Sequence, residues 1–505
     1  MKRAHQKLPA NGAEREARRQ KGQFWTPDWT ADAMVSYVLQ QDEQFLFDPA
    51  VGAGAFFLAA YRFGAAAGRT ISLAGMEIDP DALGEARQNG ISEADLSKVE
   101  IRDFVLNPPQ RRLSAIVANP PYIRHHRLAA ETKAALRLLS ARLIGAPLDG
   151  RAGLHIYFLL RALELLDRGG RLAFIMPADT CEGVAAPKLW RWITRHYCLE
   201  AVITFAAAAT PFPGVDTNPI IILIQNRPPE QYFWGVRCAE ANSDELLSCI
   251  QANFAERSYR SLTIHRRELV EGLETGLSRE PATNGHRPTF VLGDFASVLR
   301  GIATGANEYF FLTTRRAHEL NIPGEFLRPA VGRTRDVEGD EINIETLRKL
   351  ERQGRPTLLF SPDGRAMNQF PGAVQHYLQQ IESQGVHRRA LIASRNPWYK
   401  METREVPPIL FAYLGRRSVR FIRNRAGVVP LTGFLCVYPH RQDTAYIEKL
   451  WQVLQHPQTL VNLTSVGKSY GGDAIKVEPR ALEKLPLPSD MIHELGLTPI
   501  TRRLI

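Results

Sequence analysis

Short runs of apolar residues, each about as long as one strand, recur along the first half of the chain. They cover residues 45–47, 71–78, 99–102, 113–117, 171–177, 199–205 and 219–224. Segments with helical periodicity lie between several of these runs, among them 33–38 and 153–166. Strands that alternate with helices are typical of a wound α/β sheet. The pattern therefore predicts an α/β domain in this half of the chain.

The run 113–117 is followed by Asn119-Pro120-Pro121-Tyr122, and the two prolines end the strand. The loop therefore leaves the sheet at its carboxyl edge, where open α/β sheets bind ligands. The Asn119 amide and the Pro120 carbonyl offer two acceptors for a planar NH2 group. Tyr122 offers a ring for stacking a base, a contact worth roughly 1–3 kcal/mol. This combination predicts that an exocyclic base amine is held and made nucleophilic toward an electrophilic methyl group, although Asn-Pro pairs by themselves are most often turns.

A glycine-containing loop follows the first strand. Residues 48–54, Asp-Pro-Ala-Val-Gly-Ala-Gly, lead directly into a helix, and glycines at such a place let the backbone approach a ligand at the helix N-terminus. Glu77 ends the next strand, 23 residues after Gly54, close to the position of a ribose-binding acid in nucleotide-binding βαβ units. Asp103 and Phe104 end the third strand and suit an adenine amine and its ring. Taken singly, each acid could instead be a helix cap or a surface residue.

The ordered set of these motifs resembles one enzyme family. The set consists of Gly22-Gln23-Phe24-Trp25-Thr26-Pro27, Asp48-Pro49-Ala50-x-Gly52-x-Gly54, Glu77, Asp103 and Asn119-Pro120-Pro121-Tyr122. It is similar to the set found in S-adenosylmethionine-dependent DNA adenine-N6 methyltransferases of the gamma class. The resemblance implies a Rossmann-like class I methyltransferase sheet, S-adenosyl-L-methionine as the cofactor, and a C-terminal α+β target-recognition domain.

The resemblance also implies a role for each matching residue. Glu77 would hold the ribose hydroxyls with Ile78 beside it, and Asp103 and Phe104 would hold the adenine of the cofactor. The part of the site around the methionine end would comprise Thr26, Asp48, Ala50, Gly52, Gly54 and Asn119. The catalytic residues would be Asn119, Pro120, Pro121 and Tyr122. Phe212 matches by position the aromatic residue that packs on the target base opposite Tyr122, and a core or hinge aromatic is the alternative for it.

The pattern also predicts how the chain is divided. We expect a basic flexible arm over 1–21, the catalytic domain over 22–230, a helical connector over 231–290 and the DNA target-recognition domain over 291–505. Arg227-Pro228-Pro229-Glu230 interrupts the strand pattern and therefore marks the expected end of the catalytic domain. Residues 300–310 and 469–488 resemble, more loosely, the start and the end of recognition domains in the same class.

Positive charge favours a polyanionic partner. The formal net charge is +10 and the pI is about 9.4. Basic and aromatic residues are interleaved over 387–425, which fits phosphate contacts and base stacking, although a solvated face over core aromatics is the alternative. The residues expected to bind double-stranded DNA are Arg124, Arg388, Arg389, Arg395, Lys400, Arg416, Arg417, Arg420, Arg423 and Arg425.

Several other classes of site are not expected. The five cysteines are scattered, which argues against a disulfide framework and against structural zinc. The adjacent His125 and His126 have no evident third ligand, so we expect no metal. No apolar run approaches a membrane span and no secretory signal follows Met1. We therefore expect a soluble intracellular protein, and the family resemblance implies a monomer in the cytoplasm of a prokaryote, associated with the nucleoid.

The sequence thus predicts a site-specific enzyme that methylates N6 of an adenine extruded from duplex DNA, as the modification half of a restriction-modification system that can include a separately encoded endonuclease. Two alternatives stay open. One is a methyltransferase for an RNA base or a protein glutamine, and the other is a nucleic-acid-binding protein without catalysis. A fused nuclease is not expected, because no Pro-Asp is followed closely by Glu-x-Lys and the segment before Gly22 is short.

Overall fold

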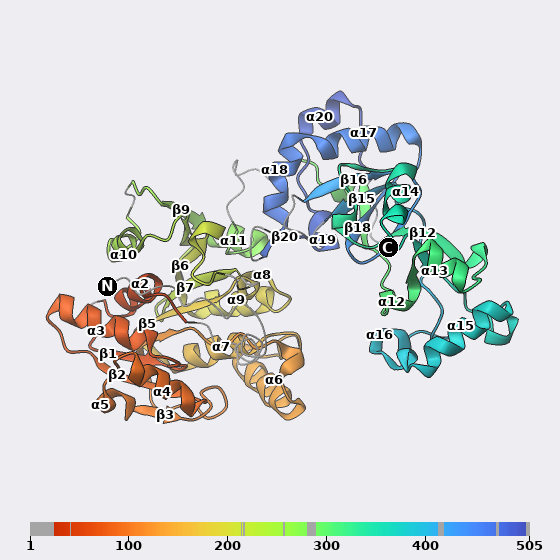
Figure 1. Ribbon diagram of the computed structural model, residues 1–505. Helices are drawn as coiled ribbons and strands as arrows, with labels where there is room; N and C mark the ends of the chain where they lie inside the picture. The colour runs from red at the N-terminus through yellow and green to blue at the C-terminus, as the bar shows by residue number, and fades with distance from the viewer. Residues whose placement is uncertain are drawn as a thin grey trace. The chain divides into compact units, whose positions relative to one another are not determined.

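The computed structural model describes residues 25–40, 42–213, 215, 218–255, 258–279, 289–412, 419–470 and 474–500. It contains two compact units, Met1–Thr283 and Asn284–Ile505 (Figure 1). The basic arm expected over 1–21 lies outside the described residues, and so do residues 280–288 near the end of the expected connector. Within the described ranges, no helix combines the length and the apolar character that a membrane span requires.

The first unit is built on a nine-stranded sheet of order β3-β2-β1-β4-β5-β7-β6-β8-β9. The strands are β1 (Phe45–Asp48), β2 (Ser72–Glu77), β3 (Val99–Ile101), β4 (Leu113–Ala118), β5 (Leu166–Pro177), β6 (Cys198–Phe205), β7 (Pro219–Gln225), β8 (Tyr232–Cys238) and β9 (Leu262–Glu268). The first five run parallel to their neighbours in the sheet, whereas β7 is antiparallel to β5 and β6. The predicted α/β class is confirmed, and every strand predicted from the apolar runs is present.

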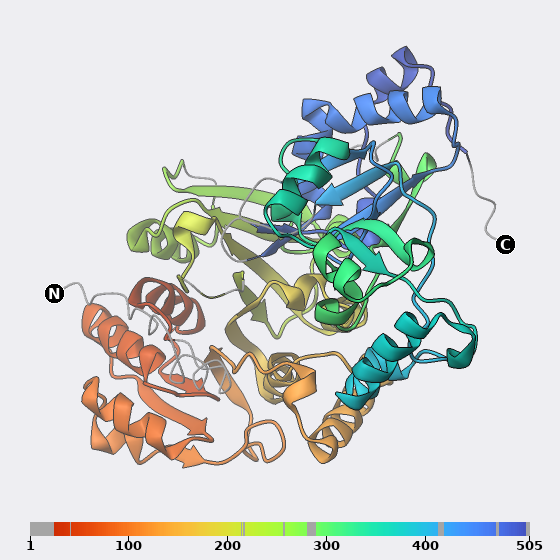
Figure 2. The same cartoon turned by 45° about the vertical axis from the view of Figure 1, so that its right-hand side comes forward.

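Helices cover both faces of this sheet (Figures 1 and 2). One face packs against α2 (Asp28–Val38), α3 (Ala55–Ala67) and α10 (Ser243–Gln251). The other packs against α6 (Ala130–Ile144), α7 (Leu154–Leu165) and α9 (Ala186–His196). Shorter helices complete the unit, namely α4 (Pro80–Gln88), α5 (Glu93–Leu96), α8 (Asp179–Glu182) and α11 (Leu269–Thr275). Because β4 is covered on both faces, its sequence is a nearly continuous apolar run.

The segment 231–290 differs from the helical connector expected there. Strand β8 pairs parallel with β6, and β9 pairs antiparallel with β8, so both extend the main sheet. The first unit therefore continues to Thr283 and does not end near residue 230. The reason is local: β9 lies at the sheet edge and only two of its seven residues, Leu262 and Arg267, are buried, so the strand has no apolar run that the sequence pattern could reveal. The buried Arg267 hydrogen-bonds to Glu271 of α11.

The second unit is α+β, as expected, and holds two separate sheets. One has the order β10-β18-β15-β16-β13, with β10 (Ala296–Arg300), β18 (Phe434–Pro439), β15 (Ile409–Ala412), β16 (Arg420–Asn424) and β13 (Glu341–Ile342). The other has the order β11-β14-β12-β17, with β11 (Phe311–Leu312), β14 (Leu358–Phe360), β12 (Leu327–Val331) and β17 (Val429–Pro430).

Different helices pack against these two sheets. The first shares a core with α17 (Thr444–Gln455), α18 (Pro457–Val466), α19 (Pro479–Leu482) and α20 (Ser489–Glu494). The second shares a core with α12 (Asn307–Phe310), α13 (Thr314–Glu319), α15 (Gly372–Ser383) and α16 (Ala390–Ala393). The helix α14 (Ile344–Arg352) follows β13, and a short hairpin joins β19 (Lys468–Tyr470) to β20 (Ala474–Lys476). The unit thus has two lobes, each with its own apolar core, and a third, smaller apolar cluster contains residues of both sheets, among them Val331 of β12 and Leu410 of β15.

Candidate active site

A cavity of about 260 Å³ opens at the carboxyl ends of β1 to β4. Strands β1 and β4 are neighbours, but β1 leads to α3 on one face of the sheet while β4 leads to α6 and α7 on the other. The two connections diverge and leave a crevice between them, which is the position where open α/β sheets bind ligands. The cavity is lined by residues that follow all four strands, including Gly52, Glu77, Asp103 and Asn119.

The glycine loop after β1 has the conformation that its sequence predicts. Gly52 and Gly54 have φ values of +53° and +85°, in the left-handed region that favours glycine. A Cβ on Gly54 would lie 2.8 Å from Cγ1 of Ile91, so space also requires glycine there. Gly54 is the N-cap of α3, whose N-terminus therefore faces the cavity. Ala50, in the same loop, also lines the cavity.

The carboxylate of Glu77 is held in place by three backbone N–H groups. Its Oε2 accepts from Gly52 N at 2.8 Å, and its Oε1 accepts from Ile78 N at 2.7 Å and from Asp79 N at 2.9 Å. Glu77 is buried and lines the cavity, and Ile78 lines it as well. A carboxylate oxygen has more than one lone pair, so a carboxylate fixed in this way can still accept from a pair of vicinal hydroxyls.

Asp103 presents a similar arrangement after β3. Its Oδ1 accepts from Val105 N at 2.8 Å and from Leu106 N at 2.9 Å, which fixes the side chain at the cavity wall. The ring of Phe104 packs between those of Phe47, at 6.1 Å, and Phe158, at 5.5 Å. An acceptor beside a fixed aromatic ring suits the amine and the ring of an adenine. Asp103 and Phe104, the two residues predicted for this role, both line the cavity.

Asp48 is the most deeply buried acid of the site, with no exposed surface. Its Oδ1 accepts from Ala50 N at 2.9 Å, but its buried Oδ2 has no hydrogen-bond partner within the described part of the chain. Burial, with a smaller contribution from the nearby Glu77 charge, raises the pKa of the Asp48 carboxyl to about 8, although the hydrogen bond from Ala50 N opposes the shift. A buried acid with an unsatisfied oxygen fits a cationic group, and the ammonium of a methionine moiety is such a group.

The loop after β4 brings two acceptors to the cavity edge. Asn119 and Pro121 line the cavity, while Pro120 is buried beside them. Asn119 Nδ2 donates to Oγ1 of the buried Thr26 at 3.2 Å, so the amide oxygen is the branch that can accept from an incoming amine. The Pro120 carbonyl accepts no hydrogen bond from the described residues. Asn119 thus lies at the cavity with its amide nitrogen engaged by Thr26, whereas Pro120 is buried beside the cavity, and their joint role as acceptors stays a prediction.

Tyr122 stands among other aromatic rings. Its hydroxyl donates to Ile175 O at 3.2 Å, and its ring meets Phe212 at 6.5 Å and 77° and His155 at 6.0 Å and 71°. Burial raises the pKa of the Tyr122 hydroxyl well above its usual value, so the phenol is neutral at physiological pH. Phe212 is buried in the core cluster and meets Tyr122 edge to face, which also fits the alternative of a core aromatic, so its role as a stacking partner stays a prediction.

Several cavity residues were not predicted. Trp25, Arg102, Leu154 and Phe158 line it together with the predicted set. Leu154 and Phe158 are four residues apart on α7, so they share one helix face. That spacing is visible in the sequence, but an apolar pair on a buried helix is indistinguishable from ordinary core packing without the fold.

The residues expected to bind DNA fall into four groups. Arg124 and Arg388 are exposed and their side chains make no hydrogen bond or ion pair with other described residues, and Lys400 is also exposed. Arg389 is exposed but pairs with Glu308, and Arg425 pairs with Glu341 and Glu448. Arg416 and Arg417 lie outside the described residues. Only the first group presents free charge to a phosphate.

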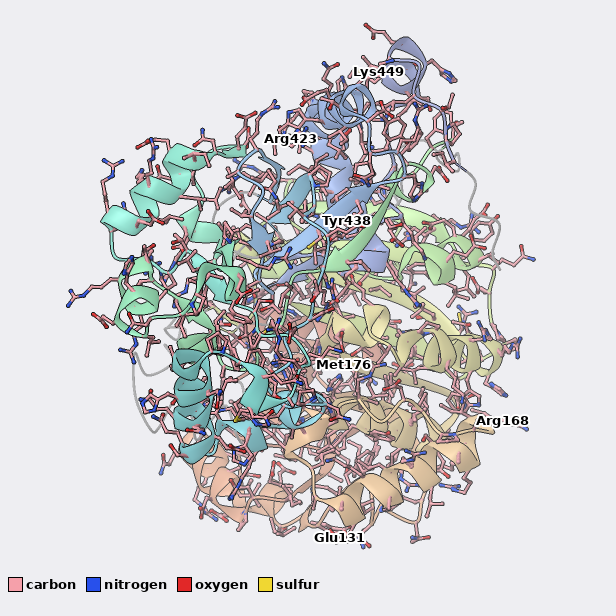
Figure 3. The ribbon with its side chains drawn as sticks, turned by 90° about the vertical axis from the view of Figure 1, so that its right-hand side faces the viewer. Glu131, Arg168, Met176, Arg423, Tyr438 and Lys449 are labelled. Carbon is pink, nitrogen blue, oxygen red and sulfur yellow. The ribbon has the colours of Figure 1, made fainter. Side chains whose placement is uncertain are left out.

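The remaining three are corrected by the structure. Arg395 donates to the carbonyls of Ala303 and Thr304, and Arg420 donates to those of Val337 and Gly339. Arg423 is only 6% exposed and donates to Glu448 and to the Pro408 carbonyl. Figure 3 labels Arg423 on β16 and Lys449 on α17, the helix that supplies Glu448. These guanidinium groups join segments of the second unit, so they are not available to DNA.

The aromatic residues of the same block are corrected too. Phe411 and Phe421 are buried with ring centroids 4.8 Å apart, and Tyr399 is buried in the other lobe. Tyr413 lies outside the described residues. The interleaved pattern therefore reflects β15 and β16 packing their aromatic residues inward, and these rings offer no stacking surface for bases.

The sheet and the cavity define the class of protein. The sheet has an antiparallel seventh strand, oriented carboxylates follow β2 and β3, and Asn119-Pro120-Pro121-Tyr122 follows β4, an arrangement that resembles a methyltransferase. Residues 9–236 match the family described as N-6 DNA Methylase, and residues 282–503 match the family described as Type II methyltransferase M.Eco57I, C-terminal domain. The chain belongs to the N-6 DNA methylase family, and it is an adenine-N6 DNA methyltransferase of the restriction-modification type. The predicted family is confirmed.

Individual relatives agree with this assignment. The type II methyltransferase M.AccI of Acinetobacter calcoaceticus is 26% identical over 490 residues, covering 95% of this chain and 87% of the relative. The type II methyltransferase M.XamI of Xanthomonas campestris pv. amaranthicola is 25% identical over 482 residues, covering 93% and 85%. The type IIL restriction-modification enzyme MmeI, solved in complex with DNA, has a similar fold, with a TM-score of 0.58 at 12% identity over 91% of this chain and 64% of that one.

Proposed function

We propose that this protein transfers the methyl group of S-adenosyl-L-methionine to N6 of an adenine extruded from a specific short sequence in duplex DNA. The observation that carries the proposal is the single cavity that joins Glu77 and Asp103 to Asn119. This shared cavity supports the proposal that the wall that would bind a nucleoside lies next to the acceptors that would hold the amine. In duplex DNA the target nitrogen lies inside the stack, so the base must leave the helix at a cost of a few kcal/mol.

The residues along the cavity fit the parts of this cofactor. Asp103 and Phe104 would hold its adenine, Glu77 would accept from its ribose hydroxyls, and the Asp48 carboxylate would pair with its ammonium group. When bound, the cofactor supplies an electrophilic methyl group on a positively charged sulfur. A positive charge near Asp48 favours the ionised carboxylate, so binding would release a proton from this residue.

The clamp residues then act on the target base. The Asn119 amide oxygen and the Pro120 carbonyl accept the two hydrogens of the N6 amine, which turns the nitrogen lone pair out of conjugation with the ring. Tyr122 and Phe212 hold the ring from its two faces, and their present contact at 77° implies that one ring turns when the base enters. No strong base is needed, because the amine proton becomes acidic only after the methyl group has been transferred. Most of the catalysis is therefore positioning.

Charge and relatives together support the DNA partner. Arg124 lies just beyond the clamp, and Arg388 and Lys400 are exposed on the second unit. Because the relatives are type II methyltransferases, we propose that this chain modifies DNA as a monomer in the prokaryotic cytoplasm, and that a separately encoded endonuclease cleaves the same sequence when it is unmodified. A non-catalytic binding protein is disfavoured because every central position of the clamp and of the nucleoside wall is occupied by a suitable residue.

The test is methyl transfer from labelled S-adenosyl-L-methionine to duplex DNA, in parallel with RNA and protein substrates. We expect label in DNA only, and sequencing of modified adenines should reveal one short recurring motif. Label in RNA or in a protein glutamine, with none in DNA, would overturn the proposal.

The clamp itself is tested by Asn119→Ala. Loss of a preorganised polar contact to the reacting group lowers kcat by roughly 10²–10³-fold. The chain supplies a matched control, because Asn107 also precedes two prolines but is exposed and does not line the cavity. We expect Asn107→Ala to keep wild-type activity, and equal effects of the two substitutions would contradict the assignment.

A further inference from the structure

His155 is a buried residue that the proposed chemistry does not use. It is 7% exposed, it lies in the first turn of α7, and its ring contacts the Tyr122 ring at 6.0 Å and 71°. Both ring nitrogens are buried, and neither has a hydrogen-bond partner among the residues that the structure describes. The buried indole of Trp190 in the same unit behaves differently, because its Nε1 donates to Thr180 O at 2.8 Å. Two unsatisfied polar atoms on one buried ring indicate a partner that arrives from outside.

The backbone around His155 makes room for the imidazole. A Cβ on Gly153 would lie 2.5 Å from His155 Cε1, so only glycine leaves space for the ring. Leu154 N donates to Ile123 O at 3.0 Å, which ties the start of α7 to the loop that carries Asn119 and Tyr122. The imidazole is therefore fixed against the catalytic loop by packing, without a hydrogen bond of its own.

The ring is neutral at physiological pH. Burial lowers the pKa of His155 to about 4, and the Asp179 charge opposes that shift only in part. The N-terminus of the twelve-residue helix α7 acts in the same direction as burial, because its dipole disfavours a cation. A neutral imidazole carries one N–H donor and one acceptor nitrogen. In the proposed complex the N6 hydrogens are bound by Asn119 and Pro120, which leaves the ring nitrogens of the base as the acceptors to be satisfied.

We propose that His155 donates a hydrogen bond to a ring nitrogen of the extruded adenine, on the edge of the base that carries N6. This inference rests on the proposed function and deepens it, because it names a residue that would recognise the target base between Tyr122 and Phe212. The acceptor is N1 or N7, since these two nitrogens flank the amine. The contact would favour adenine in the pocket and fix its rotation over Tyr122, so that N6 lies between the two clamp acceptors.

The test combines target bases that lack one acceptor with variants of the protein. Duplexes carry adenine, 1-deazaadenine or 7-deazaadenine at the methylated position, opposite an abasic site so that pairing costs are equal. For the wild type we expect one of the two analogues to lower kcat/KM about tenfold, the usual effect of one lost hydrogen bond to a buried group. In His155→Phe, which keeps a ring against Tyr122, the same analogue should cause no further loss.

Two further variants separate this contact from general packing. His155→Gln retains an N–H donor and should restore part of the activity on adenine. Tyr157→Phe removes the hydroxyl of another buried residue on α7 and should leave the discrimination between the three bases unchanged. The inference is overturned if neither analogue slows the wild type. It is also overturned if the analogue lowers kcat/KM of His155→Phe by the same factor as it lowers kcat/KM of the wild type. Absence of methyl transfer to the adenine duplex itself would count against the proposed function instead.

Discussion

At the scale of single residues, the site is a set of acceptors oriented by backbone N–H groups. Glu77 accepts three such hydrogen bonds and Asp103 two, whereas Asp48 accepts one and keeps an unsatisfied buried oxygen. The first two carboxylates are therefore held for neutral hydroxyl and amine donors. Asp48 is the one suited to a cation, because a positive charge relieves the cost of its burial.

The raised pKa of Asp48 gives a prediction about stability without cofactor. The carboxyl keeps its proton up to about pH 8 in the folded protein, but loses it near its usual pKa of 3.8 when unfolded. Between these values the folded state binds more protons, so Asp48 destabilises the fold increasingly as pH rises through this window. We expect Asp48→Asn, which cannot titrate, to show a Tm advantage over the wild type that grows from pH 5 to pH 9.

The control for this prediction is the cofactor. Adding S-adenosyl-L-methionine should raise the Tm of the wild type at pH 8 more than that of Asp48→Asn, because binding stabilises the folded state and the variant lacks the anion. A Tm difference between the two proteins that is the same at every pH would show that the carboxyl is not buried as a neutral acid.

The hydrogen bond between Asn119 and Thr26 gives a second prediction. Thr26→Val keeps the shape of the buried side chain but removes the hydroxyl that accepts from Asn119 Nδ2. The amide would then lose the contact that orients its oxygen, and we expect kcat at saturating cofactor and DNA to fall about tenfold. Thr26→Ser, which restores a hydroxyl, should recover most of the rate.

The readout that separates orientation from folding is base extrusion. Fluorescence of 2-aminopurine at the target position should rise to the same level with Thr26→Val as with the wild type. A variant that fails to extrude the base, or that loses Tm in proportion to its activity, would show that Thr26 only supports the fold.

At the scale of elements, the sheet could be predicted as far as β7 because its buried strands are short apolar runs ended by the functional loops. The order in which the motifs follow these strands also identified Glu77, Asp103 and Asn119 correctly as neighbours. Strands β8 and β9 could not be predicted in the same way. They lie at the sheet edge, and Arg267 is buried there through Glu271 and backbone carbonyls, so local polarity does not report burial. His155 was also missed, because a histidine within an apolar helix gives no sign of the ring it contacts.

The packing of β2 on the glycine loop gives a prediction at this scale. A Cβ on Gly75 would lie 2.4 Å from Val51 Cγ2 and 2.7 Å from the Asp48 carbonyl oxygen. Gly75→Ala must therefore displace the loop between β1 and α3, and we expect a loss of about 1–3 kcal/mol in the free energy of unfolding. The affinity for S-adenosyl-L-methionine, measured by calorimetry, should fall as well.

Gly84 provides the matched control. It lies in the middle of α4, and a Cβ there would meet nothing within 4 Å. Gly84→Ala should stabilise the protein by up to about 1 kcal/mol through helix propensity and leave cofactor affinity unchanged. If the two substitutions have the same effect, the close approach at Gly75 has no role in shaping the cavity.

At the scale of the whole molecule, the net charge of +10 is a poor guide to which cations meet DNA. Sequence shows how many arginines fall within a segment, but not which of them bind carbonyl groups of their own chain. In the block 388–425, Arg395, Arg420 and Arg423 do so, whereas Arg388 remains exposed and without an internal partner among the described residues. The fold decides this division, because β16 is buried along most of its length and so brings Arg423 against internal partners, whereas Arg395 is held by the carbonyls of Ala303 and Thr304.

This division predicts opposite effects for two substitutions of the same residue type. Arg388→Ala should weaken DNA binding by a similar factor on every sequence and reduce the slope of log K against log salt by about 1, as expected for one lost phosphate contact. Arg423→Ala should leave that slope unchanged and instead lower the free energy of unfolding by about 1–3 kcal/mol, because Glu448 and the Pro408 carbonyl lose their buried donor. Fluorescence anisotropy over a series of salt concentrations, with thermal unfolding of each variant, measures both quantities. A reduced slope with Arg423→Ala and none with Arg388→Ala would mean that the exposed cations are not the ones that meet phosphate.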